Sequence, residues 1–255
     1  MHQVPDLIKK NALLNEEEYE LLYRESLDQS EDFWSKQAKE YLDWISPWEK
    51  VSESDLTKGE VSWFSGGKIN ASENCIDRHL EERSSQIAII WEGDDPSVSK
   101  SITYQELYES VCRFANALKE RGVKKGDRVC IYMPMIPEAA YAMLACARIG
   151  AIHSVVFGAF APDSLEARIN DSECKVLITQ DTGVRGEKTD IPMKSNADIA
   201  LQKTPSIEKT LVVKRTGAAV DMLDGRDIWW HEALGSADSA GTPEEMDAED
   251  PPFIL

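Results

Sequence analysis

A short stretch with two glycines and two cations is the first candidate for a binding site. Residues Gly183 to Lys188 read Gly-Val-Arg-Gly-Glu-Lys and follow an apolar run typical of a strand. Glycine permits close backbone approach, Arg185 offers a fork of donors for phosphate oxygens, and Lys188 adds a point charge. The loop therefore suits a terminal phosphate, although it lacks the Walker A spacing. An ordinary solvated loop is the alternative, and composition alone favours it.

A second candidate follows another predicted strand, where Phe157, Gly158, Ala159 and Phe160 stand in a row. An aromatic ring beside two small residues can accept a flat base on its face. The alternative is a tight connection between a strand and a helix, with Phe160 in the core. These residues alone favour that simpler interpretation.

Other residue types that could do chemistry are not arranged for it. The four histidines, at positions 2, 79, 153 and 231, show no metal-ligand spacing, and the apolar surroundings of His153 predict a hydrogen-bonded core residue. Asp163, Ser164 and Glu166 fit the first turn of a helix better than a nucleophile triad. The pattern therefore assigns no catalytic residue and no metal ligand.

These candidates need a scaffold, and the pattern from about residue 86 onwards predicts one. Short β-branched runs predict strands at 87–91, 128–133, 152–157, 175–179 and 210–213. Helices are predicted between them from the Thr103–Glu106 capping box to Gly122, over 137–149 and over 162–170. This alternation predicts an α/β fold with a mostly parallel sheet flanked by helices. Ligands of such folds bind at the carboxyl ends of strands, where both candidate stretches lie.

The first 60 residues differ, because their apolar residues recur at helical spacing. Asn15 followed by Glu18 is a capping-box pattern that predicts one helix start, and Ser30 predicts a second. We therefore expect a helical N-terminal segment that packs on a larger body.

Composition excludes several classes of protein. The 255 residues include 28 Lys and Arg against 46 Asp and Glu, and the formal charge of −18 disfavours nucleic acid as a partner. The longest apolar run, Ala139 to Ala147, is half of what a membrane-spanning helix requires, and the N-terminus has no apolar signal-peptide core. The five scattered cysteines indicate buried thiols in a reducing cytoplasm.

The last residues, Pro252-Phe253-Ile254-Leu255, read as the start of another buried strand. Strands commonly continue for about five or six residues, whereas three apolar residues are present here. We therefore expect the chain to be the N-terminal part of a longer protein.

Several longer stretches carry a more specific signal. One runs from 131 to 172 and reads IYMPMIPEAAYAMLACARIGAIHSVVFGAFAPDSLEARINDS. Others are WFSGGKINASENCIDRHL at 63–80, IAIIWEGDDP at 87–96, ITYQELYESVCRFANALKERGVKKGDRV at 102–129, GVRGEK at 183–188 and GRDIWWHE at 225–232. Together they resemble the AMP-forming acetyl-CoA synthetases, or acetate–CoA ligases, of the adenylate-forming superfamily. The resemblance covers essentially the whole chain.

The resemblance implies a two-step ligase. Acetate attacks the α-phosphate of Mg-ATP to give acetyl-adenylate and pyrophosphate, and the thiol of CoA then takes the acetyl group and releases AMP. The resemblance also implies a helical segment over residues 1–70 and, over 71–255, the incomplete first part of the large AMP-binding domain. The family's phosphate loop, acetate pocket and catalytic lysine would lie beyond Leu255, so this part alone would be inactive.

Part of the CoA site can be carried over by this resemblance. The family's R-G-G-[KR] stretch, at the 3′-phosphate of CoA, matches Arg185, Gly186, Glu187 and Lys188, with Glu187 in place of the second glycine. The family's Phe-Gly-Gly near the adenine matches Phe157, Gly158 and Ala159. The resemblance thus favours phosphate binding over the solvated loop, because the family uses the chemistry that these residues allow.

Two alternatives stay open. A propionyl-CoA or other short-chain acyl-CoA synthetase would share these stretches, because the residues that size the acyl pocket are not among them. A non-catalytic module that binds CoA or a nucleotide is the alternative from a different class. A redox Rossmann domain is disfavoured, since no G-x-G-x-x-G follows any predicted strand.

Overall fold

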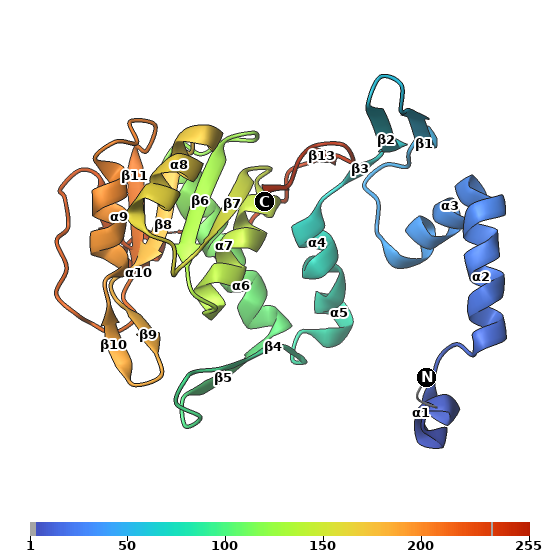
Figure 1. The fold of residues 1–255 in the computed structure, drawn as a ribbon, viewed down its shortest axis with the longest axis horizontal. Coiled ribbons are helices and arrows are strands. Elements are labelled where there is room, and N and C mark those ends of the chain that lie inside the picture. Colours follow the sequence, from blue (N-terminus) through green and yellow to red (C-terminus); the bar gives the residue numbers. More distant parts are fainter. Residues whose placement is uncertain (1–3, 236) are drawn as a thin grey trace. The chain divides into compact units, whose positions relative to one another are not determined.

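The computed structural model describes residues 4–235 and 237–255. The chain divides into two compact units, which are described separately. The N-terminal unit comprises the residues up to Ile69 together with Asp247–Glu249, and the α/β unit comprises Asn70–Met246 together with Asp250–Leu255. Figure 1 shows helices and a strand pair in the first and a helix-flanked sheet in the second.

The N-terminal unit begins with helices and continues into strands. Its elements are α1 (Asp6–Asn11), α2 (Glu16–Asp28), α3 (Ser30–Tyr41), β1 (Lys50–Asp55), β2 (Glu60–Ser65) and β3 (Lys68–Ile69). Both predicted helix starts are confirmed. The side chain of Asn15 accepts the backbone N–H of Glu18, whose carboxylate accepts the backbone N–H of Asn15, and α3 begins at Ser30.

The prediction of helix throughout the first 60 residues is wrong from residue 42 onwards, because α3 ends at Tyr41 and strand β1 begins at Lys50. β1 and β2 pair as an antiparallel hairpin, with Lys50 opposite Ser65. Aromatic packing explains the difference, because the ring of Phe64 lies 5.4 Å from Trp44 and 5.0 Å from Trp48 between centroids. Packing of this kind overrides the local helical spacing.

The α/β unit is built on a six-stranded sheet in the order β12-β11-β8-β6-β7-β14, with every neighbouring pair parallel. The strands are β6 (Arg128–Met133), β7 (Ile152–Phe157), β8 (Val176–Gln180), β11 (Lys209–Val213), β12 (Asp227–Trp229) and β14 (Phe253–Ile254). The predicted α/β class and parallel sheet are therefore confirmed. All carboxyl ends of these strands meet at one edge of the sheet.

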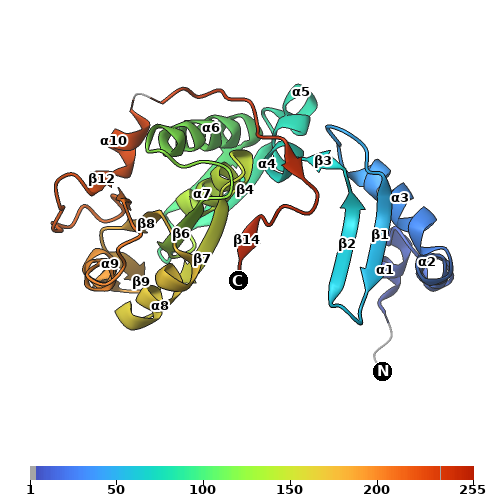
Figure 2. The same cartoon turned by 90° about the horizontal axis from the view of Figure 1, so that it is seen from above.

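Helices cover both faces of this sheet, as Figure 2 shows. They are α6 (Tyr104–Glu120), α7 (Pro137–Arg148), α8 (Pro162–Ser172), α9 (Met193–Leu201) and α10 (Trp230–Leu234). Along β6, Val129 and Ile131 belong to the core with α6, α7 and α10, whereas Cys130 and Tyr132 belong to the core with α8 and α9. This alternation of side chains across a strand divides the core into two layers.

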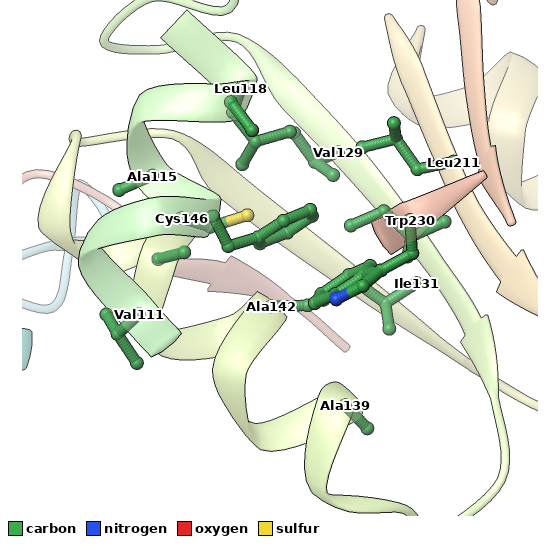
Figure 3. Close-up of a cluster of buried hydrophobic side chains, with 14 of the residues drawn as sticks. Val111, Ala115, Leu118, Val129, Ile131, Ala139, Ala142, Cys146, Leu211 and Trp230 are labelled. Atoms are coloured by element: carbon green, nitrogen blue, oxygen red, sulfur yellow. The ribbon is translucent and has the colours of Figure 1, made fainter. Parts of the chain in front are cut away.

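The larger core layer is shown in Figure 3. Its labelled side chains come from α6, α7, α10 and the two strands β6 and β11: Val111, Ala115, Leu118, Val129, Ile131, Ala139, Ala142, Cys146, Leu211 and Trp230. The ring of Trp230 stacks on that of Phe114 at 3.9 Å between centroids. The small residues of α7 let this helix approach the strands closely, and the aromatic pair fills the space near α10.

One predicted strand lies outside the parallel sheet. β4 (Ile87–Glu92) pairs antiparallel with β5 (Ser99–Thr103), for which no prediction was made. The short segment between them cannot form a parallel crossover, which requires a dozen or more residues. The remaining short elements are α4 (Ala71–Cys75), the 3₁₀ turn η1 (Asp77–His79), α5 (Leu80–Arg83), β9 (Gly183–Arg185), β10 (Lys188–Ile191) and β13 (Met246–Asp247).

Candidate functional site

A β-hairpin at the carboxyl edge of the sheet brings Arg185 and Lys188 together. β9 and β10 follow β8 directly and pair antiparallel, with Arg185 opposite Lys188. Residues directly opposite each other in such a pair carry neighbouring side chains on one face. Both residues are exposed, and neither forms an ion pair within the described part of the chain. The hairpin therefore presents two available cations to solvent.

The turn between these cations explains why glycine is needed at only one of its positions. Gly186 has a φ of 60°, whereas Glu187 is not in the positive-φ region. A glycine with positive φ at the first central position is typical of a type II′ turn. The second position accepts Glu187 without backbone strain, so its replacement of a glycine leaves the shape of the turn unaltered.

A second hairpin holds the tip of the first. The backbone N–H of Gly186 donates to Oδ2 of Asp94 at 2.6 Å, and Asp94 lies between β4 and β5. β4 is itself fixed, because Nε1 of Trp91 donates to the carbonyl of Met135 at 2.9 Å. No local pattern points to Asp94, because 92 positions separate it from Gly186.

A buried carboxylate joins the loops that follow β8 and β11. Asp181 is fully buried and accepts the backbone N–H groups of four residues at 2.8–3.2 Å, namely Thr182, Arg215, Thr216 and Gly217. Backbone N–H groups thus take the place of a cationic partner. The sequence analysis did not predict that Asp181 joins these loops. Its position directly after a buried strand is the signal that could have indicated this.

The second candidate stretch follows β7. Phe157 ends the strand and is 63% exposed, and Ala159 is also exposed. Gly158 is required by close packing, because a Cβ at this position would lie 3.2 Å from Cε of Met193 and 3.3 Å from the backbone nitrogen of Pro134. The ring of Phe157 is therefore available to a ligand at the same edge as the hairpin.

Phe160 has the structural role that the simpler interpretation predicted. It is half-buried against the core layer of α8 and α9, and its carbonyl accepts the hydroxyl of Tyr132 at 2.8 Å. The guanidinium carbon of Arg168 lies 4.5 Å from the centre of its ring. Phe160 thus closes the connection from β7 to α8 and leaves Phe157 as the exposed ring of the pair.

Met193 lies between the two candidate stretches. It is 2% exposed at the start of α9, and its Cγ lies 3.4 Å from the position that a Cβ of Gly183 would take. The same side chain crowds Gly158. Both stretches therefore share a buried neighbour, although no hydrogen bond or ion pair joins them directly among the described residues.

A cavity of about 120 Å³ opens beside the hairpin. Its lining comes from β4, β6, β8, β9 and β11 or from the residues that directly follow these strands: Trp91, Glu92, Gly93, Asp94, Pro134, Met135, Ile136, Gln180, Val184 and Arg215. The guanidinium carbon of Arg215 lies 4.9 Å from the centre of the Trp91 ring. A cavity of this size holds a few water molecules, whereas a nucleotide needs roughly 300 Å³ or more.

His153 differs in part from its prediction. It is partly buried in β7 with its ring 5.6 Å from that of Phe253, but its Nδ1 is buried without a hydrogen-bond partner among the described residues. Burial lowers the pKa of this imidazole, which keeps it neutral. The prediction that His153 is hydrogen-bonded is therefore wrong for Nδ1, which has no partner within the part of the chain that the structure describes.

The other candidates lie only in part where they were predicted, since Glu166 comes after the first turn of α8. Asp163 is in the first turn of α8, and Glu166 pairs with Lys203 at 3.4 Å. All five cysteines are free, and four are buried, whereas Cys75 is exposed and contradicts the prediction of buried thiols. Over residues 4–235 and 237–255, no three His, Cys, Asp or Glu side chains gather as metal ligands. No helix in the same residues is both long and apolar enough to cross a membrane.

Comparison of the sequence with models of known protein families identifies the family to which the chain belongs. The family model described as AMP-binding enzyme matches residues 76–255, well over half of the chain. The chain belongs to the AMP-binding enzyme family. The model described as acetyl-coenzyme A synthetase N-terminus matches residues 19–75 of this AMP-binding enzyme.

Individual relatives agree with the family. Acetyl-coenzyme A synthetase 2 of Pseudomonas aeruginosa and acetyl-coenzyme A synthetase of Alkalilimnicola ehrlichii are each 58% identical to all 255 residues, and the match covers 39% of each relative. The solved structure of acetoacetyl-CoA synthetase from Streptomyces lividans aligns with a TM-score of 0.83 at 26% identity, over 93% of this chain and 36% of that one. The chain thus spans about 39% of the curated relatives' length. The resemblance to acetyl-CoA synthetases is confirmed.

Proposed function

We propose that this chain is the N-terminal part of an AMP-forming acetate–CoA ligase. The observation that carries the proposal is the 58% identity to acetyl-coenzyme A synthetase 2 of Pseudomonas aeruginosa across all 255 residues. In the proposed reaction a carboxylate oxygen of acetate attacks the α-phosphorus of ATP, and pyrophosphate leaves. The sulfur of CoA then attacks the acetyl carbonyl, its proton goes to solvent, and AMP leaves with the bonding electrons.

The part of the reaction that we assign to this chain is binding of the nucleotide end of CoA. Arg185 and Lys188 would contact the 3′-phosphate, and Phe157 with Gly158 and Ala159 would contact the adenine. The geometry supports this assignment, because two unpaired cations and an exposed ring lie at the carboxyl edge of a parallel sheet. Charge-assisted hydrogen bonds from a guanidinium suit a phosphate well.

ATP and magnesium belong to the same proposal, with their sites outside residues 1–255. We assign no residue of this chain to the metal. We further propose a cytoplasmic location, since all five cysteines are free, as is usual in a reducing compartment.

A chimaera tests the proposal directly. This chain would replace the matched 39% of the Pseudomonas aeruginosa relative, whose remaining residues would supply the rest of the enzyme. We expect acetate-dependent exchange of pyrophosphate into ATP, followed by formation of acetyl-CoA when CoA is added. The intact relative is the positive control, and the same chimaera without acetate is the blank.

The result also separates the proposal from a non-catalytic binding module. A chimaera that folds, as judged by circular dichroism and a cooperative melt, but shows no exchange above the blank would contradict the ligase proposal. Binding of CoA by such an inactive chimaera would instead support a module that only binds the nucleotide.

A further inference from the structure

The turn of the β9–β10 hairpin, which carries Arg185 and Lys188, depends on a contact from another element more than on its own strand pairing. Only two residue pairs define the β9–β10 ladder, Arg185 with Lys188 and Ile191 with Gly183, and the register shifts between them. Two-stranded hairpins are marginally stable without further support. The residues that carry the two cations therefore need a contact beyond their own strands to keep one geometry.

Asp94 makes that contact. Its Oδ2 accepts the N–H of Gly186 at 2.6 Å, at the residue between the two cations. Because Gly186 has a left-handed φ, its N–H direction belongs to this turn geometry, and a bond to it selects that geometry.

The turn that carries Asp94 is held by hydrogen bonds of its own. The N–H of Gly93 donates to the carbonyl of Val98 at 2.8 Å, and Oδ1 of Asp95 accepts the N–H of Ser97 at 2.9 Å. Gly93 has no room for a side chain, since a Cβ would lie 3.1 Å from the Trp91 ring. The hydrogen bond from Trp91 to Met135 then links this turn to the end of β6.

We propose that Asp94 is a positioning residue that fixes Arg185 and Lys188 for the 3′-phosphate of CoA. This inference rests on the proposed function of the hairpin and adds a residue from a separate element to it. Asp94 does not touch the phosphate, which its negative charge would repel. It acts through the backbone of Gly186, and its effect is confined to ligands that carry the 3′-phosphate.

Two substitutions separate the hydrogen bond from the charge. Asp94→Ala removes the acceptor, whereas Asp94→Asn keeps an oxygen that can accept the N–H of Gly186 and removes the charge. Asp190→Asn is the matched control, because Asp190 is an exposed carboxylate on β10 with no hydrogen bond or ion pair among the described residues. It removes one negative charge near the two cations, as Asp94→Asn does, and leaves the contact at Gly186 intact.

The first measurement is amide hydrogen exchange at Gly186 in the chain of 255 residues. We expect faster exchange in Asp94→Ala than in the parent, and parent-like exchange in Asp94→Asn and Asp190→Asn. This measurement needs no ligand, so it tests the contact independently of the function proposed for the hairpin.

The second measurement is the dissociation constant for CoA and for dephospho-CoA, by titration calorimetry on the chimaera. For Asp94→Ala we expect CoA to bind about three- to tenfold more weakly, because an exposed hydrogen bond to a charged acceptor is lost. Binding of dephospho-CoA should be unchanged. Asp94→Asn should bind CoA at least as tightly as the parent, and Asp190→Asn should not bind it more weakly.

The outcomes identify which proposal fails. If the parent does not prefer CoA over dephospho-CoA, the phosphate site itself is wrong and the role of Asp94 falls with it. If Arg185→Ala abolishes the preference but Asp94→Ala does not, only the positioning role is overturned. Equal weakening of both ligands by Asp94→Ala, or a loss in Asp94→Asn as large as in Asp94→Ala, also overturns it.

Discussion

Arg185→Ala is the most direct perturbation of the proposed CoA site. Arg185 ends β9, is exposed, and has no ion pair within the described residues, so its removal leaves no buried partner unsatisfied. Exposed substitutions of this kind change stability by about 0.5 kcal/mol or less. A change in CoA binding can therefore be attributed to the lost contact and not to unfolding.

The expected loss of CoA affinity in Arg185→Ala follows from the solvent exposure of the Arg185 guanidinium. A hydrogen bond to a charged group contributes about 1.5–3 kcal/mol, and solvent screening places an exposed contact at the lower end of that range. About 1.5 kcal/mol corresponds to roughly tenfold in affinity. Lys188→Ala should lose less, because a flexible ammonium is more strongly hydrated and does not form the two-pronged contact of a guanidinium.

The assay is the Michaelis constant for CoA in the chimaera, with dephospho-CoA as a second substrate. We expect Arg185→Ala to raise the Michaelis constant for CoA about tenfold, and to leave dephospho-CoA turnover and acetate-dependent pyrophosphate exchange unchanged. Arg83→Ala is the matched control, since Arg83 is an exposed arginine of α5 without an ion pair among the described residues. Equal losses with both substrates, or slower exchange, would refute the assignment.

Three further predictions concern the scaffold of the site. Gly158→Ala should lower the melting temperature by about 2–4 °C, because its Cβ would crowd Met193 and the backbone after β6, at a cost of about 1 kcal/mol. Asp181→Ala should lower the unfolding free energy, measured by urea titration, by at least about 2 kcal/mol, because buried N–H groups lose their acceptor. Asp181→Asn, which keeps one acceptor oxygen, should lower it less. Burial raises the pKa of Asp227, but hydrogen bonds from Arg226 and Lys194 outweigh it and lower the pKa to about 2. The unfolded chain therefore binds this proton first, so unfolding free energy should fall from about pH 4 to pH 2, and less steeply in Asp227→Asn.

The parts of the fold that follow local patterns were predictable from the sequence. The capping box of Thr103 and Glu106 marks the start of α6, and Pro137 lies in the first turn of α7, as expected. β6 and β7 have the predicted bounds, because buried parallel strands are continuous apolar runs. Each of these signals is contained within a few neighbouring residues.

The errors arise where the deciding contact is distant in the sequence. The spacing of apolar residues before position 60 favours helix, yet residues 50–65 form a hairpin in which Phe64 packs against Trp44 and Trp48. β4 was predicted as a member of the main sheet, because its apolar run resembles that of a buried strand. Its Ile90 is in fact 77% exposed, so the run alone did not distinguish a central strand from an exposed ribbon.

The same reasoning applies to the site. The position of the proposed CoA-binding residues was predictable, because Arg185, Gly186 and Lys188 lie in one short stretch after a strand. The residues that hold the stretch in place were not predictable, because Asp94 and Met193 reach it from other elements. A residue that contacts a ligand can be recognised from its chemical type and local sequence. A residue that supports the site can be recognised only when the fold is known, because the fold brings it near.

The strong net negative charge of the chain does not oppose a phosphate site, because electrostatic interactions in salt are local. At physiological ionic strength the screening length is about 8 Å, so acids elsewhere on the surface act weakly on a ligand at the hairpin. The charges that matter are those on β9, β10 and the turn between them, where Arg185 and Lys188 share one face. Glu187 in the turn, Asp190 on β10 and the neighbouring Asp94 carry the opposing charges, and Asp94 is directed at the backbone N–H of Gly186. The hairpin thus separates the two functions of charge, with cations available for the ligand and one carboxylate engaged in holding the turn.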